Sequence, residues 1–256
     1  MFEDMFPSIG RRPAAHGPVD LGAVDRAARI IYEALDIIGH RVAPGLTTGK
    51  LADEAVSCAR HGGVDPGVII RVSPEDVVWH GLPGPRVLEE GEIVTVDIAC
   101  SVRGWWADAA RTFAVGAVDS KRRNLMRAAL AGMKEAVAAM RVGESGASAA
   151  GRIAALCRAE GVSLVGEGAG HGLGARLHEV PSITYDGRPH PPLEAGRVYS
   201  AEPVFTSGSG GIVISGDGST ATVDAEPAAH YEVTVLLVEH GPQVLGTPDW
   251  MDREPC

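Results

Sequence analysis

The sequence has few aromatic residues and no long apolar run. Phe, Trp and Tyr together make up 5% of its 256 residues, whereas hydrophobic residues of all kinds make up 45%. No uncharged apolar run approaches the roughly 18 residues of a membrane span, so we expect no membrane partner. The hydrophobic share still suffices for a sizeable core, and we therefore expect a globular protein.

Positive charge is also scarce. Lys and Arg total 23 against 33 Asp and Glu, which gives a formal net charge of −10. Binding to nucleic acid depends largely on cationic contacts with phosphates. The charge balance therefore argues against a broad surface for nucleic acid.

Cysteine is rare and unpaired in the sequence. Cys58, Cys100, Cys157 and Cys256 are scattered and form no C-x-x-C pair, so neither a disulfide framework nor a cysteine zinc site is indicated. The N-terminal segment MFEDMFPSIGRRP places acids before any apolar stretch and does not resemble a secretory signal. We expect free thiols in a reducing cytoplasm.

The order of patterns along the chain predicts an α+β protein. Residues 1–20 are rich in Pro, Gly and Arg and read as an irregular arm. Apolar residues at helical spacing predict helices near residues 21–41, 50–61, 120–140 and 147–160, and apolar runs between turns predict strands at 77–83, 92–100 and 107–116.

An internal repeat divides the rest of the chain into two similar halves. Gly45 and Gly143 lie 98 residues apart, as do His80 and His178, and beyond a short insertion LEEGEIVTVDIA lies over LEAGRVYSAEPV. Asp97 then falls on Glu202. Chance similarity between two helical hairpins is the alternative, but the matching of His with His and acid with acid argues against it. We expect one domain, residues 21–256, with halves at about 21–118 and 119–250 and a site between them.

A set of hard ligands is embedded in strand-like sequence. Isolated buried carboxylates need a cationic partner, and four carboxylates with one imidazole can hold two divalent ions about 3.5–4 Å apart. Mn, Co, Fe(II) or Zn would suit this set. The residues are Asp97, Asp108, His171, Glu202 and Glu232. Any one of them alone would be ordinary as half of a structural ion pair.

Glycines and histidines surround these acids. The motif GAGHGLG, residues 168–174, centres on His171. It matches neither G-x-G-x-x-G nor a P-loop, so a nucleotide site is disfavoured. His80 and His178 each begin a His-x-x-Pro frame, and a repeat-related pair facing a metal site suits acid, base or oxyanion-donor roles better than a structural role.

Together these motifs resemble type I methionine aminopeptidases. The segments VVWHGLP, VDIACSVRGWWADAARTF, GAGHGLGARLHEVP, SAEPV and HYEVTV match that family's site motifs in order, from about Leu21 to the C-terminal strands. The resemblance implies the pita-bread fold, with curved antiparallel sheet inside two similar halves, helices outside, and a dinuclear metal centre.

The resemblance also implies roles for the candidate residues. Asp97, Asp108 and Glu232 would hold one ion, and the other would be held by Asp108, His171, Glu202 and Glu232. His80 and His178 would flank the scissile bond, while Glu202 would act as general base or proton shuttle. The implied reaction is hydrolysis of an amide next to a free amino group, with a peptide N-terminus or a small amide as substrate.

The expected substrate pocket departs from the family pattern. Residues 60–71 form a shortened segment without the usual Tyr and Cys, Leu177 stands where Phe is common, and residues 210–215 around Ile212 contain no Trp. We expect Arg71, Trp79, Leu177 and Ile212 to line the pocket. Arg71 could face a substrate carboxylate or lie on the solvated surface.

Two alternatives to a methionine aminopeptidase stay open. The altered pocket favours a specialised metalloenzyme that acts on a non-methionine peptide or a small metabolite. A binding protein that keeps the fold without catalysis would be marked by a lost ligand, and none of the five is missing.

Overall fold

The computed structural model describes residues 18–166, 170–188, 190–253 and 255. The expected N-terminal arm, residues 1–20, lies almost wholly outside the described residues, and so does Gly168 of the glycine-rich motif. The helices are α2 (Leu21–Gly39), α3 (Thr48–His61), α4 (Ser120–Ala139) and α5 (Ala147–Glu160), and a short 3-10 helix spans Asp249–Asp252. No helix within the described residues is long and apolar enough to cross a membrane.

Side-chain caps fix the helix ends close to the predicted positions. The carboxylate of Asp20 accepts a hydrogen bond from the Ala23 N–H, and Asp119 caps α4 in the same way. The Thr47 hydroxyl accepts from the Lys50 N–H, so α3 begins at Thr48, two residues before the predicted start. The predicted helices are confirmed, with ends that differ by at most two residues.

The described strands form four antiparallel sheets. The first has the order β1 (Ile69–Pro74), β3 (Ile93–Val102), β4 (Trp105–Ala114), and the second has the order β10 (Ile212–Ile214), β11 (Thr220–Thr222), β2 (Val77–Trp79). The third has the order β12 (Ala228–His230), β9 (Val204–Thr206), β5 (Ser163–Leu164). The fourth has the order β14 (Gly241–Val244), β13 (Val233–Val238), β8 (Val198–Ala201), β6 (His171–Leu173), β7 (Glu179–Ser182). The predicted α+β class is confirmed.

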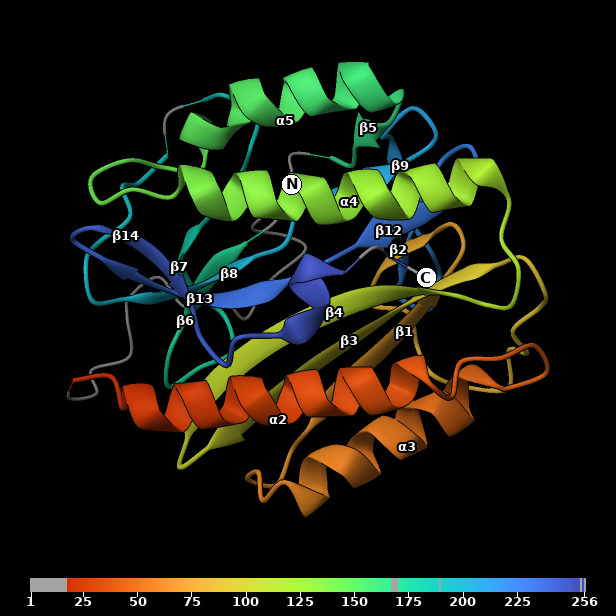
Figure 1. Ribbon diagram of the computed structural model, residues 1–256, viewed down its shortest axis with the longest axis horizontal. Coiled ribbons are helices and arrows are strands. Elements are labelled where there is room, and N and C mark those ends of the chain that lie inside the picture. Colours follow the sequence, from red (N-terminus) through yellow and green to blue (C-terminus); the bar gives the residue numbers. More distant parts are fainter. Residues whose placement is uncertain (1–17, 167–169, 189, 254, 256) are drawn as a thin grey trace.

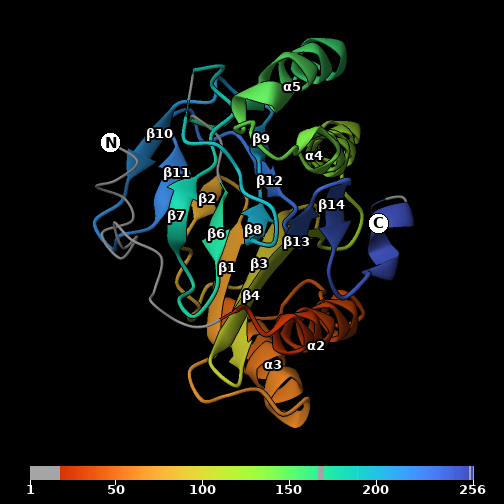
Figure 2. The same ribbon diagram turned by 90° about the vertical axis from the view of Figure 1, so that its left-hand side faces the viewer.

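The helices cover the strands as two pairs. Figure 1 shows α2 and α3 below the strands and α4 and α5 above them, and in Figure 2 most strands lie to the left of α2 and α4, with β13 and β14 between these two helices. α2 packs on β3 and β4, whereas α4 packs on β9 and β12. Fully buried side chains such as Ile31, Leu35 and Phe205 fill the space between the helices and the strands. The strands that carry Asp97, Asp108 and His171 therefore rest on a rigid support.

Hydrogen bonds join β4 of the first half to β13 of the second half and to the residue just before it. The Thr234 hydroxyl accepts from the Asp108 N–H at 3.0 Å and donates to the Asp108 carbonyl at 2.8 Å. The Glu232 N–H donates to the Ala110 carbonyl at 3.0 Å. These bonds fix Asp108 beside Glu232.

Candidate active site

Two acids of the first half lie on one face of a strand pair. Asp97 on β3 is opposite Ala110, and Asp108 on β4 is opposite Ala99. Because strand side chains alternate between faces with period two, both carboxyls point to the same side. Burial raises the pKa of Asp108, and the two carboxyls are close enough that the charge of Asp97 helps to raise it further.

Two acids of the second half meet at the end of a second strand pair. Ala201 on β8 is opposite Val233 on β13, so Glu202 and Glu232 extend from neighbouring strand ends. Glu232 is 1% exposed and Glu202 is 8% exposed. Carboxylates of Asp108, Glu202 and Glu232 are thus gathered in one buried cluster.

His171 connects the two groups of acids. Its Nε2 lies 3.3 Å from Glu202 Oε1 and 3.9 Å from Asp108 Oδ2. The Ser200 hydroxyl accepts from the His171 backbone N–H at 3.1 Å and donates to Glu202 Oε1 at 2.9 Å. His171 Nδ1 lies 3.0 Å from the Gly172 carbonyl, so a tautomer with the proton on Nδ1 leaves Nε2 as a lone-pair donor toward the acids.

Burial makes this cluster electrostatically unfavourable without a cation. Burial raises the pKa of Glu202 to about 8 and that of Asp97 to about 6. Burial together with repulsion from neighbouring carboxylates raises the pKa of Asp108 and of Glu232 well above their usual range. Burial also lowers the pKa of His171 to about 3, so the imidazole supplies no compensating charge at neutral pH.

The donor set fits divalent ions. Asp108 Oδ1 and Glu232 Oε1 are buried and have no hydrogen-bond partner among the described residues. Ligand atoms of Asp108, His171 and Glu232 all lie within 4.8 Å of one another. Oxygen atoms that are orphaned and clustered in this way are satisfied by cations that several carboxylates can bridge.

A cavity of about 500 Å³ opens onto the cluster. Its lining includes Asp97 and Asp108 on one side and His80, His178, Arg71 and Leu177 around the rest. His178 packs edge-on against His171, with ring centroids 4.4 Å apart. Burial lowers the pKa of His178 to about 4 and lowers the pKa of His80, so both rings are neutral at pH 7 and can donate or accept one hydrogen bond.

Trp79 and Ile212 are not among the described residues that line this cavity. Both lie on the sheet formed by β10, β11 and β2, and they pack in a small apolar cluster with Val78 and Val165. The next residue, His80, has a positive φ of 61°. This conformation is uncommon for a non-glycine residue, and it turns the chain at His80 away from the course of β2. The expectation that Trp79 and Ile212 line the substrate pocket stays a prediction, since these residues pack in the apolar cluster, whereas Arg71 and Leu177 line the cavity.

His230 joins the cluster although the sequence reasoning did not include it. Its Nε2 lies 3.6 Å from Glu202 Oε2 and 3.9 Å from Glu232 Oε2. The signal was present in the motif HYE, because residues two apart in an extended segment share a face. The motif SAE has the same form, with Ser200 two residues before Glu202 and bonded to it.

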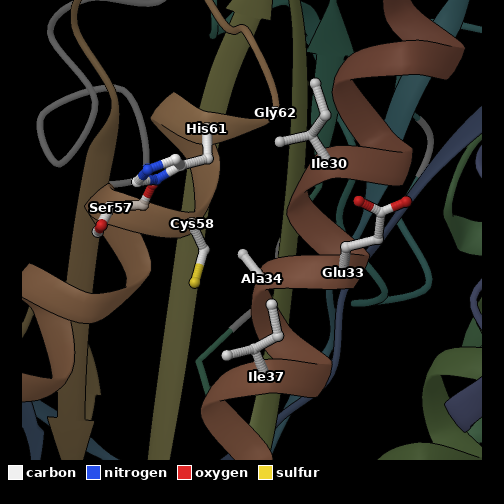
Figure 3. Close-up of a pocket in the computed structure, with 8 residues that line it drawn as sticks. All are labelled: Ile30, Glu33, Ala34, Ile37, Ser57, Cys58, His61 and Gly62. Atoms are coloured by element: carbon white, nitrogen blue, oxygen red, sulfur yellow. The ribbon is translucent and has the colours of Figure 1, made fainter.

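Another cavity, of about 380 Å³, lies between α2 and α3 (Figure 3). It brings together one carboxyl, Glu33, with the Cys58 thiol and the His61 imidazole, and Nδ1 of His61 lies 2.7 Å from the Ser57 carbonyl. Burial raises the pKa of the Cys58 thiol, which keeps it protonated and poorly nucleophilic. The Cys58 thiol in this cavity is therefore not an activated nucleophile.

Comparison with known proteins agrees with a metal site at the acid cluster. The sequence pattern of metallopeptidase family M24 matches residues 22–239. The chain is 31% identical to the methionine aminopeptidase of Clostridium perfringens, over 88% of this chain and 95% of that one. It is 33% identical to methionine aminopeptidase 1 of Mycobacterium tuberculosis, over 88% of this chain and 92% of that one.

Solved structures resemble the fold closely. The crystal structure of methionine aminopeptidase from Thermotoga maritima matches with a TM-score of 0.84 and 27% identity, covering 93% of this chain and 99% of that one. Prolidase from Pyrococcus furiosus matches with a TM-score of 0.73 at 19% identity, covering 89% of this chain and 64% of that one. The second likeness concerns the fold alone.

Proposed function

The chain belongs to metallopeptidase family M24, and from this premise we propose that it is a two-metal aminopeptidase that releases the first residue of a peptide. The observation that carries the proposal is the buried cluster of Asp108, Glu202 and Glu232, in which one oxygen of Asp108 and one of Glu232 have no hydrogen-bond partner among the described residues. Such a cluster has no stabilising role by itself, since unpaired buried carboxylates destabilise a fold. It suits a pair of divalent ions.

We assign the ligands as the sequence motifs suggested. By the family resemblance Asp97, Asp108 and Glu232 would hold one ion, and the other would be held by Asp108, His171, Glu202 and Glu232. Bound divalent ions supply a water of near-neutral pKa and polarise a carbonyl oxygen. Asp108 Oδ1 and Glu232 Oε1, which have no hydrogen-bond partner among the described residues, would be available to such ions.

The remaining polar residues then transfer protons and stabilise the charge that develops on the substrate. Glu202, held by the Ser200 hydroxyl at 2.9 Å, takes the proton of the attacking water and passes it to the leaving amine. His178 lies on the cavity wall beside His171, and as a neutral imidazole it donates a hydrogen bond to the oxyanion that develops on the substrate carbonyl. His80 lines the same cavity and positions the scissile amide.

The two halves, about 21–118 and 119–250, act in this proposal as one catalytic domain. The bonds from Thr234 and Glu232 to β4 support it, because they join residues of both halves next to the cluster. We also propose a cytoplasmic location and a peptide N-terminus as the partner. The free thiols of Cys58, Cys100 and Cys157 are in keeping with a reducing compartment.

A panel of short peptides that differ only in the first residue tests the function. Protein loaded anaerobically with Mn, Co or Fe(II) is expected to release that residue, and a chelator is expected to stop the release. Absence of release with every metal and every first residue would contradict the enzyme and favour a binding protein with the same fold.

Arg71 favours a second candidate, an aminopeptidase for substrates that carry a carboxylate. Arg71 is opposite Asp97 on the neighbouring strand and lines the cavity. Its guanidinium makes no hydrogen bond or ion pair with the described residues. Since guanidinium groups bind carboxylates through paired, charge-assisted hydrogen bonds, Arg71 can hold a carboxylate of the first side chain or of the peptide C-terminus. Weak release of methionine accompanies this candidate.

The Arg71→Gln variant separates the two candidates. If Arg71 binds a carboxylate, kcat/KM for peptides with that group falls by about tenfold or more, in line with about 1.5–3 kcal/mol for a charged hydrogen bond. Amide analogues of the same peptides keep their rate. Asp-first peptides and C-terminal amides distinguish the two carboxylate sources, and Arg60→Gln, at an exposed position of α3, is the control. If kcat/KM falls equally for charged and uncharged peptides, Arg71 neutralises the charge of Asp97 and does not bind a substrate carboxylate.

A further inference from the structure

The side chain of His230 is buried and unsatisfied. The residue is 2% exposed, and its Nε2 has no hydrogen-bond partner among the described residues. The same atom faces Glu202 and Glu232, at 3.6 Å from Oε2 of the first and 3.9 Å from Oε2 of the second. A polar ring atom in this position needs a partner that the side chains do not supply.

The backbone holds His230 firmly in this place. The His230 N–H donates to Thr112 Oγ1 at 2.8 Å, and the same hydroxyl lies 2.9 Å from the His230 carbonyl. On its other side β12 pairs with β9, where His230 is opposite Val204. His230 therefore sits on a paired strand, as a precise metal site requires, and not on a free loop.

The distances from His230 Nε2 to the two carboxylates fit atoms that bind one shared ion better than atoms that contact each other directly. A nitrogen–oxygen distance of 3.6 Å or more is too long for a hydrogen bond. Two ligand atoms bound at about 2.1 Å with a tetrahedral angle lie about 3.4 Å apart. Ligand atoms of Glu202, His230 and Glu232 lie within 4.8 Å of one another, and the distance from His171 Nε2 to Glu202 Oε1, between two assigned ligands, is 3.3 Å.

We propose that His230 Nε2 is a direct ligand of the metal pair, on the ion that Glu202 and Glu232 share. This inference rests on the metal pair of the proposed function and adds a second imidazole to the five residues assigned there. Imidazole ligands suit Zn and Fe(II), whereas carboxylate ligands suit Mn. The second imidazole therefore shifts the metal preference of the site toward the former ions.

Cobalt binding tests the inference without any measurement of activity. In protein titrated with two equivalents of Co(II), each coordinated imidazole contributes a strongly shifted, exchangeable N–H proton to the paramagnetic NMR spectrum. The wild-type protein is expected to show two such signals. His171→Gln and His230→Gln are each expected to keep one, and the two variants should lose different signals.

Calorimetry of the same samples supplies a second readout. His230→Gln is expected to weaken binding of one Co(II) by about tenfold or more, while His240→Gln, at an exposed position, binds as the wild type does. If His230→Gln does not fold, the wild type and His171→Gln still decide the matter, because a remaining imidazole signal in His171→Gln supports the inference. A single coordinated imidazole in the wild type, lost in His171→Gln, overturns it while the metal pair stands. Failure of Co(II) to bind at all overturns the proposed function as well.

Discussion

The acid cluster and the cavity above it differ in how far they keep the family pattern. Every ligand position of the cluster is present, and strands from both halves bring Asp108, Glu202 and Glu232 together. The cavity is lined by Arg71 and Leu177, and the sequence is expected to depart from the family pattern near this lining, in residues 60–71 and at Leu177. The chemistry and the choice of substrate are therefore separable, and substitutions in the two regions should change different quantities.

The largest effect is expected from Asp108→Ala. Because the assigned role of Asp108 is to bridge both ions, its removal should abolish binding of the metal pair and reduce hydrolysis to background. Elemental analysis of dialysed protein, together with peptide hydrolysis, measures both. Asp53→Ala, at an exposed position of α3, is the control and should bind two ions. An Asp108→Ala protein that keeps two ions would remove the bridging role.

His178→Ala should affect the rate and spare the metals. Loss of one donor to a developing oxyanion lowers turnover by about 10²–10³, whereas the metal content should stay at two ions. The experiment measures kcat and metal content for both the variant and the wild type. Parallel loss of metal and activity would make His178 a ligand, and the separation between the cluster and the cavity would fail at this residue.

The pH dependence of stability should reveal the carboxylates of the cluster. Burial raises the pKa of Glu202 from 4.5 to about 8, so ionisation is less favourable in the folded, metal-free protein than in the unfolded chain. The free energy of unfolding of that protein should therefore fall between pH 7 and 8, by on the order of 1 kcal/mol. The lowered pKa of His171 changes the free energy of unfolding only below about pH 6.5, so it does not oppose the fall between pH 7 and 8.

Metal loading should reverse the loss, because the ions bind the ionised carboxylates. Calorimetric scans are expected to show a metal-induced rise in Tm that is larger at pH 8 than at pH 7, by about 2–4 °C. A rise that is equal at both pH values would indicate that Glu202 is already ionised in the metal-free fold.

The smallest effect concerns methionine. Leu177→Phe restores an aromatic wall to the cavity, and a contact between sulfur and an aromatic ring contributes about 0.3–1.5 kcal/mol. Release of Met should gain up to about tenfold over release of Ala, with metal content unchanged. Leu21→Phe, 39% exposed at the start of α2, controls for added apolar surface. No change in selectivity would place the methionine pocket elsewhere.

The sequence predicted the helices and the cluster better than the cavity. Helix ends follow from local signals such as the Asp20 and Asp119 caps, and the cluster follows from acids in apolar strands that require a partner. The repeat then related Asp97 to Glu202 across the two halves. These signals need no knowledge of the tertiary structure.

The remaining features depend on tertiary contacts. Strand β1 was missed because IIRVSP has no clear alternation and ends in Pro, and it is defined by pairing with β3. Trp79 packs into a satellite core because β2 pairs with β11. The approach of His230 to Glu202 depends on Thr112 of the other half, so the motif HYE alone could suggest the shared face of His230 and Glu232 but not their partners.

Anomalous diffraction from crystals soaked in Mn or Co tests most directly whether the buried acids are a metal centre. The account predicts two peaks about 3.5–4 Å apart, with Asp108 and Glu232 bridging them. Crystals of the loaded protein without anomalous peaks at the cluster, and with its carboxyls joined directly to one another, would contradict the account.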